Sequence, residues 1–130
     1  MRGLHWFRND LRLQDNRALD DLFQAVDEWC GLFVLEHRLV NKPSVSRKRL
    51  SFLFECLDDL ATDITQVGNR LVIIEGPAET QIPQVMHEMS ASVLSFNEST
   101  TPFAKSRDQS VICSVEKAGH RVLKRRDHVI

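Results

Sequence analysis

Short apolar runs alternate with longer amphipathic stretches along this 130-residue sequence. Each apolar run is only four or five residues long, whereas the stretches between them carry apolar residues at helical spacing. Near-continuous apolar runs are typical of parallel strands that are buried on both faces, and parallel strands need helical crossovers between them. The alternation therefore predicts an α/β protein in which a parallel sheet is flanked by helices.

The predicted strands and helices follow from these runs and from the residues that interrupt them. Strands are predicted over residues 3–7, 32–35, 71–74, 92–96 and 120–124, and helices over residues 16–29, 46–67, 78–89 and 103–118. The strand over 71–74 is expected to be buried on both faces. Gly31, Gly68 and Gly119 each follow a predicted helix, where a residue without Cβ adopts a positive φ at low cost, so all three are expected to be C-caps.

Right-handed crossovers favour one simple arrangement of these five strands. It is a Rossmann-like, doubly wound parallel sheet in the order 3-2-1-4-5, with helices on both faces. The strand order reverses between strands 1 and 4, and ligands of such folds bind outside the carboxyl ends of the strands at that point. The loops after Phe7 and Phe96 are therefore expected to carry function, and the loop after Leu35 is expected to flank them.

Composition and motifs exclude several classes of function. The formal net charge of -1 provides no overall positive field for DNA. No apolar run approaches the roughly 20 residues that span a bilayer, and the N-terminus lacks the apolar region of a secretory signal, so a cytoplasmic protein with no membrane contact is expected. Three widely spaced cysteines without a Cys-x-x-Cys pair indicate reduced thiols. Phosphate-binding glycine motifs, metal-ligand spacings and a nucleophile elbow are absent from the sequence, so we predict no catalytic residue and no metal site.

The first loop is unusually rich in polar residues for a turn at the carboxyl edge of a sheet. Asp15 or Asn16 is expected to cap the first helix by accepting its free N–H groups. Arg8, Asn9 and Asp10 follow directly on the strand and have no such cap to make. Their side chains are therefore candidates for hydrogen bonding to a planar or phosphate-bearing ligand.

The segment from Trp6 to Leu19, WFRNDLRLQDNRAL, resembles the N-terminal signature of the DNA photolyase and cryptochrome family. Shorter matches follow in order at Arg49–Leu53, Leu57, Leu60, Gly68–Leu71, Gly76, Asn97, Pro102, Arg107–Asp108 and Asp127–His128. The resemblance implies that residues 1–130 form the family's N-terminal α/β domain. In the family this domain precedes a larger helical domain that binds FAD and docks damaged DNA, and that helical domain is absent from this chain.

The resemblance also implies a function for the α/β domain. In many family members it binds a light-harvesting antenna chromophore, which passes excitation to the flavin. The leading hypothesis is therefore an antenna-chromophore-binding domain of a photolyase or cryptochrome-like flavoprotein, which is not catalytic by itself. The full-length protein would act in DNA photorepair or in a blue-light response. The alternative is a structural docking module that binds no chromophore and only supports the helical FAD domain.

Candidate residues for the antenna come from the family pattern and from topology. The resemblance implies Asp10, Arg49 and Asn97 as contacts for a deazaflavin or flavin antenna at the strand ends. His37 is placed by topology only, and Glu98 is a further candidate in the fourth loop.

The resemblance also bears on the choice of chromophore and partners. A methenyl-folate antenna is held in the family by an acidic residue after strand 4. The corresponding positions here are Phe103 and Ala104, so a deazaflavin or flavin is favoured. FAD is expected only in the missing helical domain, which is the expected partner and the only expected route to damaged DNA.

Overall fold

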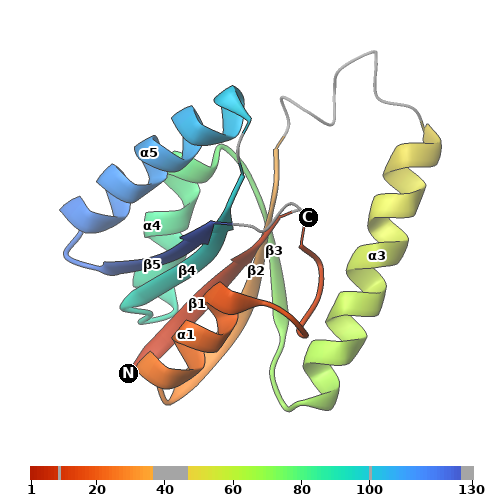
Figure 1. Cartoon of the computed structure of the whole chain (residues 1–130), viewed down its shortest axis with the longest axis horizontal. Coiled ribbons are helices and arrows are strands. Elements are labelled where there is room, and N and C mark those ends of the chain that lie inside the picture. Colours follow the sequence, from red (N-terminus) through yellow and green to blue (C-terminus); the bar gives the residue numbers. More distant parts are fainter. Residues whose placement is uncertain (9, 37–46, 100, 127–130) are drawn as a thin grey trace.

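A computed structural model describes residues 1–8, 10–36, 47–99 and 101–126 of the chain (Figure 1). The strands are β1 (Arg2–Phe7), β2 (Glu28–Leu35), β3 (Leu71–Glu75), β4 (Val93–Glu98) and β5 (Arg121–Arg126). The helices are α1 (Arg17–Ala25), α3 (Arg47–Gln66), α4 (Ala78–Glu88) and α5 (Pro102–Lys117). Strands and helices alternate along the described chain, as the sequence predicts.

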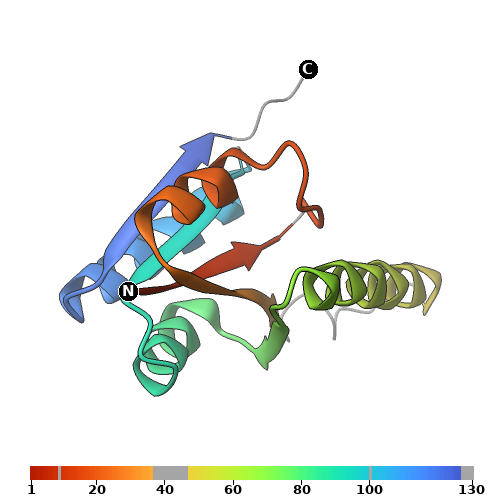
Figure 2. The ribbon, with the colours of Figure 1, turned by 90° about the horizontal axis from the view of Figure 1, so that it is seen from below.

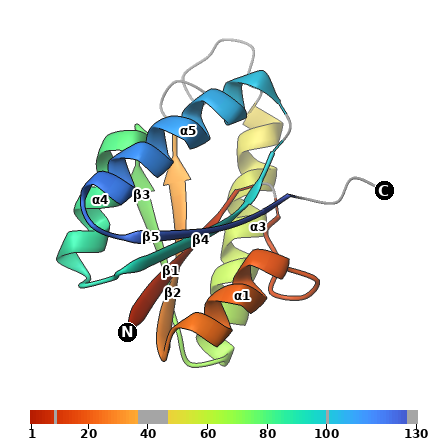
Figure 3. The ribbon, with the colours of Figure 1, turned by 60° about the vertical axis from the view of Figure 1, so that its left-hand side comes forward.

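All five strands are parallel and form one sheet in the order β3-β2-β1-β4-β5. Helices α4 and α5 cover one face of the sheet, and α1 and α3 lie on the other (Figures 1 and 3). The predicted α/β class and strand order are confirmed. Because β1 pairs with both β2 and β4, the carboxyl ends of β1 and β4 form the switch point of the fold.

The core has two layers because alternate residues of a strand point to opposite faces. On β1, Leu4 and Trp6 belong to the core under α4 and α5, and the Trp6 ring packs edge-on against Phe96. Phe7 belongs to the other core cluster, together with Leu22 of α1 and residues of α3. Both layers contain side chains that have no solvent exposure. Among the described helices none is long and apolar enough to cross a membrane, and the three cysteines are free thiols.

The boundary between α1 and β2 differs from the prediction. The helix ends at Ala25 rather than at residue 29, and β2 begins at Glu28 rather than at residue 32. Val26 continues the apolar spacing of the helix, but its φ of -132° is already extended. The prediction of a Gly31 C-cap is therefore wrong, because Gly31 pairs with His5 inside the sheet. The other two predicted caps are confirmed by positive φ values of 85° and 87° at Gly68 and Gly119.

The prediction that the third strand is buried on both faces is also wrong. Strand β3 lies at the edge of the sheet, and Ile73 in its centre is 51% exposed. A continuous apolar run does not distinguish an edge strand from a central one, so the pattern alone overstates the burial of this strand.

Gly31 allows close packing between β2 and its neighbours. A Cβ at this position would lie 2.9 Å from Ile64 Cδ1, 3.0 Å from Phe7 Cε2 and 3.1 Å from Leu71 Cδ1. We expect Gly31→Ala to lower the free energy of unfolding by about 1–3 kcal/mol, because the extra methyl group overpacks the core. Urea unfolding measures this change, with Ser110→Ala on the exposed face of α5 as the control. Equal stability of Gly31→Ala and the unaltered chain would contradict this packing.

Candidate functional site

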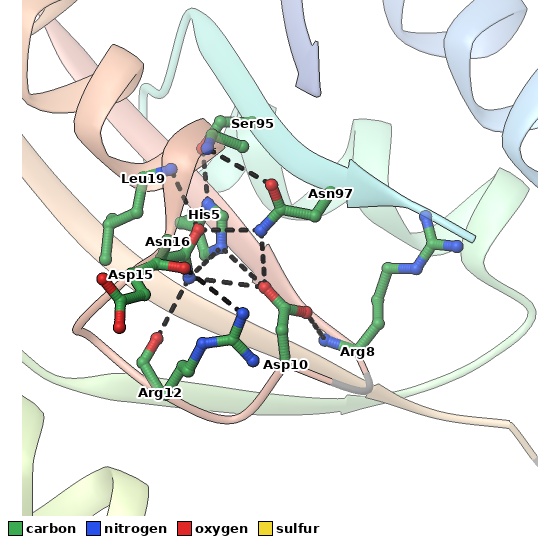
Figure 4. A network of polar contacts seen from close by, with 10 residues as sticks. His5, Arg8, Asp10, Arg12, Asp15, Asn16, Leu19, Ser95 and Asn97 are labelled. Carbon is green, nitrogen blue, oxygen red and sulfur yellow. Dashed lines mark hydrogen bonds and ion pairs between the residues drawn. The ribbon is translucent and has the colours of Figure 1, made fainter. Parts of the chain in front are cut away.

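A buried carboxylate lies in the loop that follows β1 (Figure 4). Asp10 is 3% exposed, and its Oδ2 accepts a hydrogen bond of 2.6 Å from Asn97 Nδ2 and one of 3.3 Å from Asn16 Nδ2. Its Oδ1 accepts a longer bond of 3.4 Å from the backbone N–H of Arg8. Asn97 lies near the end of β4, and Asn16 immediately precedes α1. One side chain therefore connects three elements at the switch point.

The two asparagines also complete the first turn of α1. Asn16 Oδ1 accepts a hydrogen bond of 3.2 Å from the N–H of Leu19, which confirms Asn16 as the N-cap. Asn97 Oδ1 accepts one of 3.2 Å from the N–H of Ala18, and Asn97 Nδ2 donates to Asn16 Oδ1 at 2.7 Å. These bonds satisfy helix N–H groups that have no partner within the helix. The amide of Asn97 therefore bridges the Asp10 carboxylate and the start of α1.

His5 extends this network into the middle of β1. Its ring has no solvent exposure, and Nδ1 lies 2.7 Å from the hydroxyl of Ser95, its partner across β1 and β4. Nε2 lies 3.3 Å from Asn16 Nδ2 and 3.9 Å from Asp10 Oδ2. Burial lowers the pKa of His5, although the nearby carboxylate of Asp10 opposes the change. The ring is therefore neutral at neutral pH.

The carboxylate of Asp10 responds to the same contacts in the opposite sense. Burial by itself raises the pKa of Asp10, but the nearby His5 ring and the hydrogen bond from Asn97 outweigh that effect and lower the pKa below its ordinary value. A neutral histidine, two amides and an ionised carboxylate therefore share one buried polar cluster. In its interior the cluster holds a single negative charge.

The side chain of Arg8 does not belong to this cluster and lies on the opposite face of the sheet. Its Nη1 donates a hydrogen bond of 2.8 Å to Asp108 Oδ1 of α5, and both side chains are buried. The structure therefore separates the side chain of Arg8 from that of Asp10, although the sequence suggests that they act together. Glu98 is separate as well, because its carboxylate pairs with Lys124 of β5 at 3.1 Å.

Helix α3 presents an apolar stripe that is only partly covered. Leu57, Leu60 and Ile64 in its later turns are buried. Leu50 and Leu53 belong to the same stripe in the earlier turns but are half-buried. The helix protrudes at one end of the molecule (Figure 2). The first half of α3 therefore keeps an uncovered apolar surface on its sheet side.

The uncovered surface continues onto the edge of the sheet. Ile73 of β3 shares a sheet face with Leu71, which packs against the core under α3, yet Ile73 is about half exposed. Phe54 flanks the leucine stripe and is exposed, and Arg49 is exposed in the first turn of α3. Half-buried or exposed apolar residues and the exposed Arg49 thus lie on α3 and β3, the two elements that follow β2 in the described chain.

Two of the predicted site residues cannot be placed. Asn9 and His37 are outside the described residues. Within the described ranges, no group of three or more His, Cys, Asp or Glu side chains could hold a metal ion.

Sequence reasoning missed two functional features of this region. It did not include His5 among the site candidates and did not connect this residue to Ser95, because that contact depends on the register between β1 and β4. It also gave no role to Asp108, which lies 100 residues from Arg8 in the chain. A histidine in the middle of an apolar strand is the one signal that could have indicated the buried network.

Residues 3–130 match the family model described as DNA photolyase. The chain belongs to the DNA photolyase family. Cryptochrome-1 of Spalax judaei is 31% identical over 128 residues, which are 98% of this chain and 22% of that protein. The deoxyribodipyrimidine photo-lyase of a Synechococcus strain is 29% identical over 127 residues, which are 98% of this chain and 26% of the relative. The photolyase family chain described here thus spans about a quarter of the length of these relatives.

Solved structures of photolyases and cryptochromes have the same fold. An archaeal photolyase from Sulfolobus tokodaii, whose structure contains two FAD molecules, matches with a TM-score of 0.90 and 29% identity over 99% of this chain and 30% of that one. A Synechocystis cryptochrome matches with a TM-score of 0.88 and 22% identity over 95% of this chain and 27% of that one. The α/β domain is therefore part of larger proteins in this family.

The buried network makes folding of this photolyase family domain sensitive to acid. The pKa of His5 lies below its ordinary value of 6.5 in the folded chain, so the unfolded chain takes up a proton first as the pH falls. We expect the free energy of unfolding to decrease below pH 6.5 and to decrease again as Asp10 protonates below its ordinary pKa of 3.8. Urea unfolding across this pH range measures both effects.

A substitution measures how much His5 contributes to the pH dependence of stability. The free energy of unfolding should depend less steeply on pH in His5→Gln than in the unaltered chain, between pH 6.5 and the range where carboxylates titrate. His87→Gln, at an exposed position of α4, should leave the slope unchanged. An identical pH dependence in His5→Gln and the unaltered chain would contradict the assignment.

Proposed function

We propose that this chain is the antenna-chromophore-binding domain of a photolyase or cryptochrome-like flavoprotein. The proposed ligand is a deazaflavin or flavin, bound between the first half of α3 and the carboxyl ends of the strands. The observation that supports this proposal most is the apolar stripe of α3, whose half-buried members Leu50 and Leu53 continue beyond the part that the sheet covers. A flat aromatic ring system inserted there would bury these side chains together with Ile73.

The polar residues of the region have two different roles in this proposal. Asp10 and Asn97 are buried and bonded to each other, so they fix the shape of the first and fourth loops. Arg49 is exposed in the first turn of α3, and a guanidinium there suits a phosphate or an acidic ring position. We keep His37 and Asn9 as predicted contacts from the neighbouring loops, and assign Arg8 and Glu98 to supporting positions because each pairs with another side chain.

The relatives favour a flavin-type ligand. The structure of the Sulfolobus tokodaii photolyase carries two FAD molecules with the implication of a novel light-harvesting cofactor. Excitation transfer needs a dye that is bound, oriented and shielded from water, and it needs no catalytic group from the protein. This requirement agrees with a site that has apolar walls beside hydrogen-bonded polar side chains.

The role in the whole protein follows from the family. We propose that a helical FAD-binding domain completes the protein in the cytoplasm and that damaged DNA is contacted only through that domain. The function of the parent is then DNA photorepair or a blue-light response, and this domain by itself is not catalytic.

Direct binding tests the proposal. The purified chain is mixed separately with 8-hydroxy-5-deazaflavin, FMN, FAD and methenyltetrahydrofolate and then passed through a gel-filtration column. We expect at least one deazaflavin or flavin to elute with the protein, with retained near-ultraviolet or blue absorbance, and we expect the folate to separate from it. Loss of every dye would favour the alternative, in which this domain only docks the helical domain.

Two substitutions on α3 distinguish the sheet-facing side of the helix from its outer side. Leu53→Glu places a charge in the apolar wall, so we expect it to weaken dye binding at least about tenfold. Phe52→Glu lies outside the apolar stripe of α3, where Phe52 is 68% exposed, and this variant should bind dye as the unaltered chain does. Fluorescence titration measures both affinities. Equal affinities for the two variants would contradict the proposed location.

A further inference from the structure

Two arginines share one aromatic ring and one carboxylate on the face of the sheet opposite the proposed chromophore site. The guanidinium carbons of Arg8 and Arg107 lie 4.8 and 5.0 Å from the ring centre of Trp6. Asp108 Oδ1 lies 2.8 Å from Arg8 Nη1 and 3.6 Å from Arg107 Nε. The second distance is too long for a hydrogen bond. Asp108 is therefore an acidic partner that the two arginines share, and Glu36 adds a second negative charge that acts on Arg107.

The hydrogen bonds of this pair are incomplete. Arg8 Nη2 and Arg107 Nε are buried and have no hydrogen-bond partner in the part of the chain that the structure describes. The side chains are 6% and 13% exposed, so solvent does not readily supply the missing acceptors. Burial and the charge of Arg8 lower the pKa of Arg107, while Asp108 and Glu36 oppose the change. Glu36 contributes charge, but its Oε1 accepts a hydrogen bond from the N–H of Ala78.

The outer rim of the pair is aromatic and positive. Arg107 lies 5.7 Å from the ring of Phe103, which is 45% exposed in the first turn of α5. That turn contains no acidic residue, so the positive end of the helix dipole is not compensated by its own side chains. Thr101 caps the helix by accepting a hydrogen bond from the N–H of Ala104. The first turn of α5 therefore places the positive end of a helix dipole next to Arg107.

We propose that Arg107 and Arg8 form a binding site for a carboxylate group, distinct from the chromophore site. Arg107 contacts the carboxylate at the rim, Arg8 adds a second positive charge beneath it, and Phe103 covers one side. A guanidinium matches a carboxylate in shape because two parallel N–H groups donate to its two oxygens. The carboxylate belongs either to an acidic protein segment or to a small organic acid, and the experiment separates these sources.

Trp6 provides the signal for the test. The chain contains two tryptophans, so Trp29→Phe leaves Trp6 as the single reporter beside both arginines. This variant is titrated with a capped tetraglutamate peptide and, separately, with glutarate, while tryptophan fluorescence is recorded. We expect a saturable change with at least one of the two. Arg107→Gln should weaken that binding at least about tenfold, and Arg121→Gln at the exposed start of β5 should not.

The outcomes separate the sources and can overturn the proposal. Saturation by the peptide alone supports an acidic protein segment, and saturation by both probes supports a site for small organic acids. A measurement on the unaltered chain avoids any folding defect of Arg107→Gln: the NMR signal of Arg107 Nε–H should shift with the same midpoint as the fluorescence. No saturable fluorescence change with either probe, or no shift of that signal, overturns the proposal.

Discussion

The buried carboxylate of Asp10 is the interaction on which the rest of the switch point depends. It accepts hydrogen bonds from Asn97 and Asn16, and the same two amides satisfy the first N–H groups of α1. An ionised group in an apolar interior is stable only when such donors surround it. The end of β1, the start of α1 and the end of β4 therefore have one relative position in which all of these groups are paired. A rigid edge of this kind suits a domain that orients a ligand and performs no chemistry on it.

The turn of the chain after β1 divides the polar residues of this loop between the two faces of the sheet. Asp10 joins the network under α1, whereas Arg8, two residues earlier, pairs with Asp108 of α5. The charge-rich loop after β1 thus contributes to two regions with different chemistry. One is the apolar wall of α3 with its polar loops, and the other is the cationic corner at Trp6.

The general fold could be predicted from the sequence because it depends on local patterns. Apolar runs, amphipathic spacing and the glycines after α3 and α5 predicted the element order, and crossover handedness predicted the sheet order. Asn16 was predictable as a helix cap for the same local reason. The start of β2 could not be predicted in this way, because Val26 continues the helical spacing although its backbone is already extended. The pair of Arg8 and Asp108 and the exposure of Ile73 depend on packing between distant segments, which no local pattern contains.

The most direct test of chromophore binding by this photolyase family domain is a crystal structure of the chain grown with FMN. We expect electron density for the ring system between the first half of α3 and the carboxyl ends of β2 and β3, in contact with Leu53. The hydrogen bond between Asp10 and Asn97 should remain in place beside it. An empty region there at saturating FMN, or a flavin ring bound elsewhere on the domain, would contradict the proposed site.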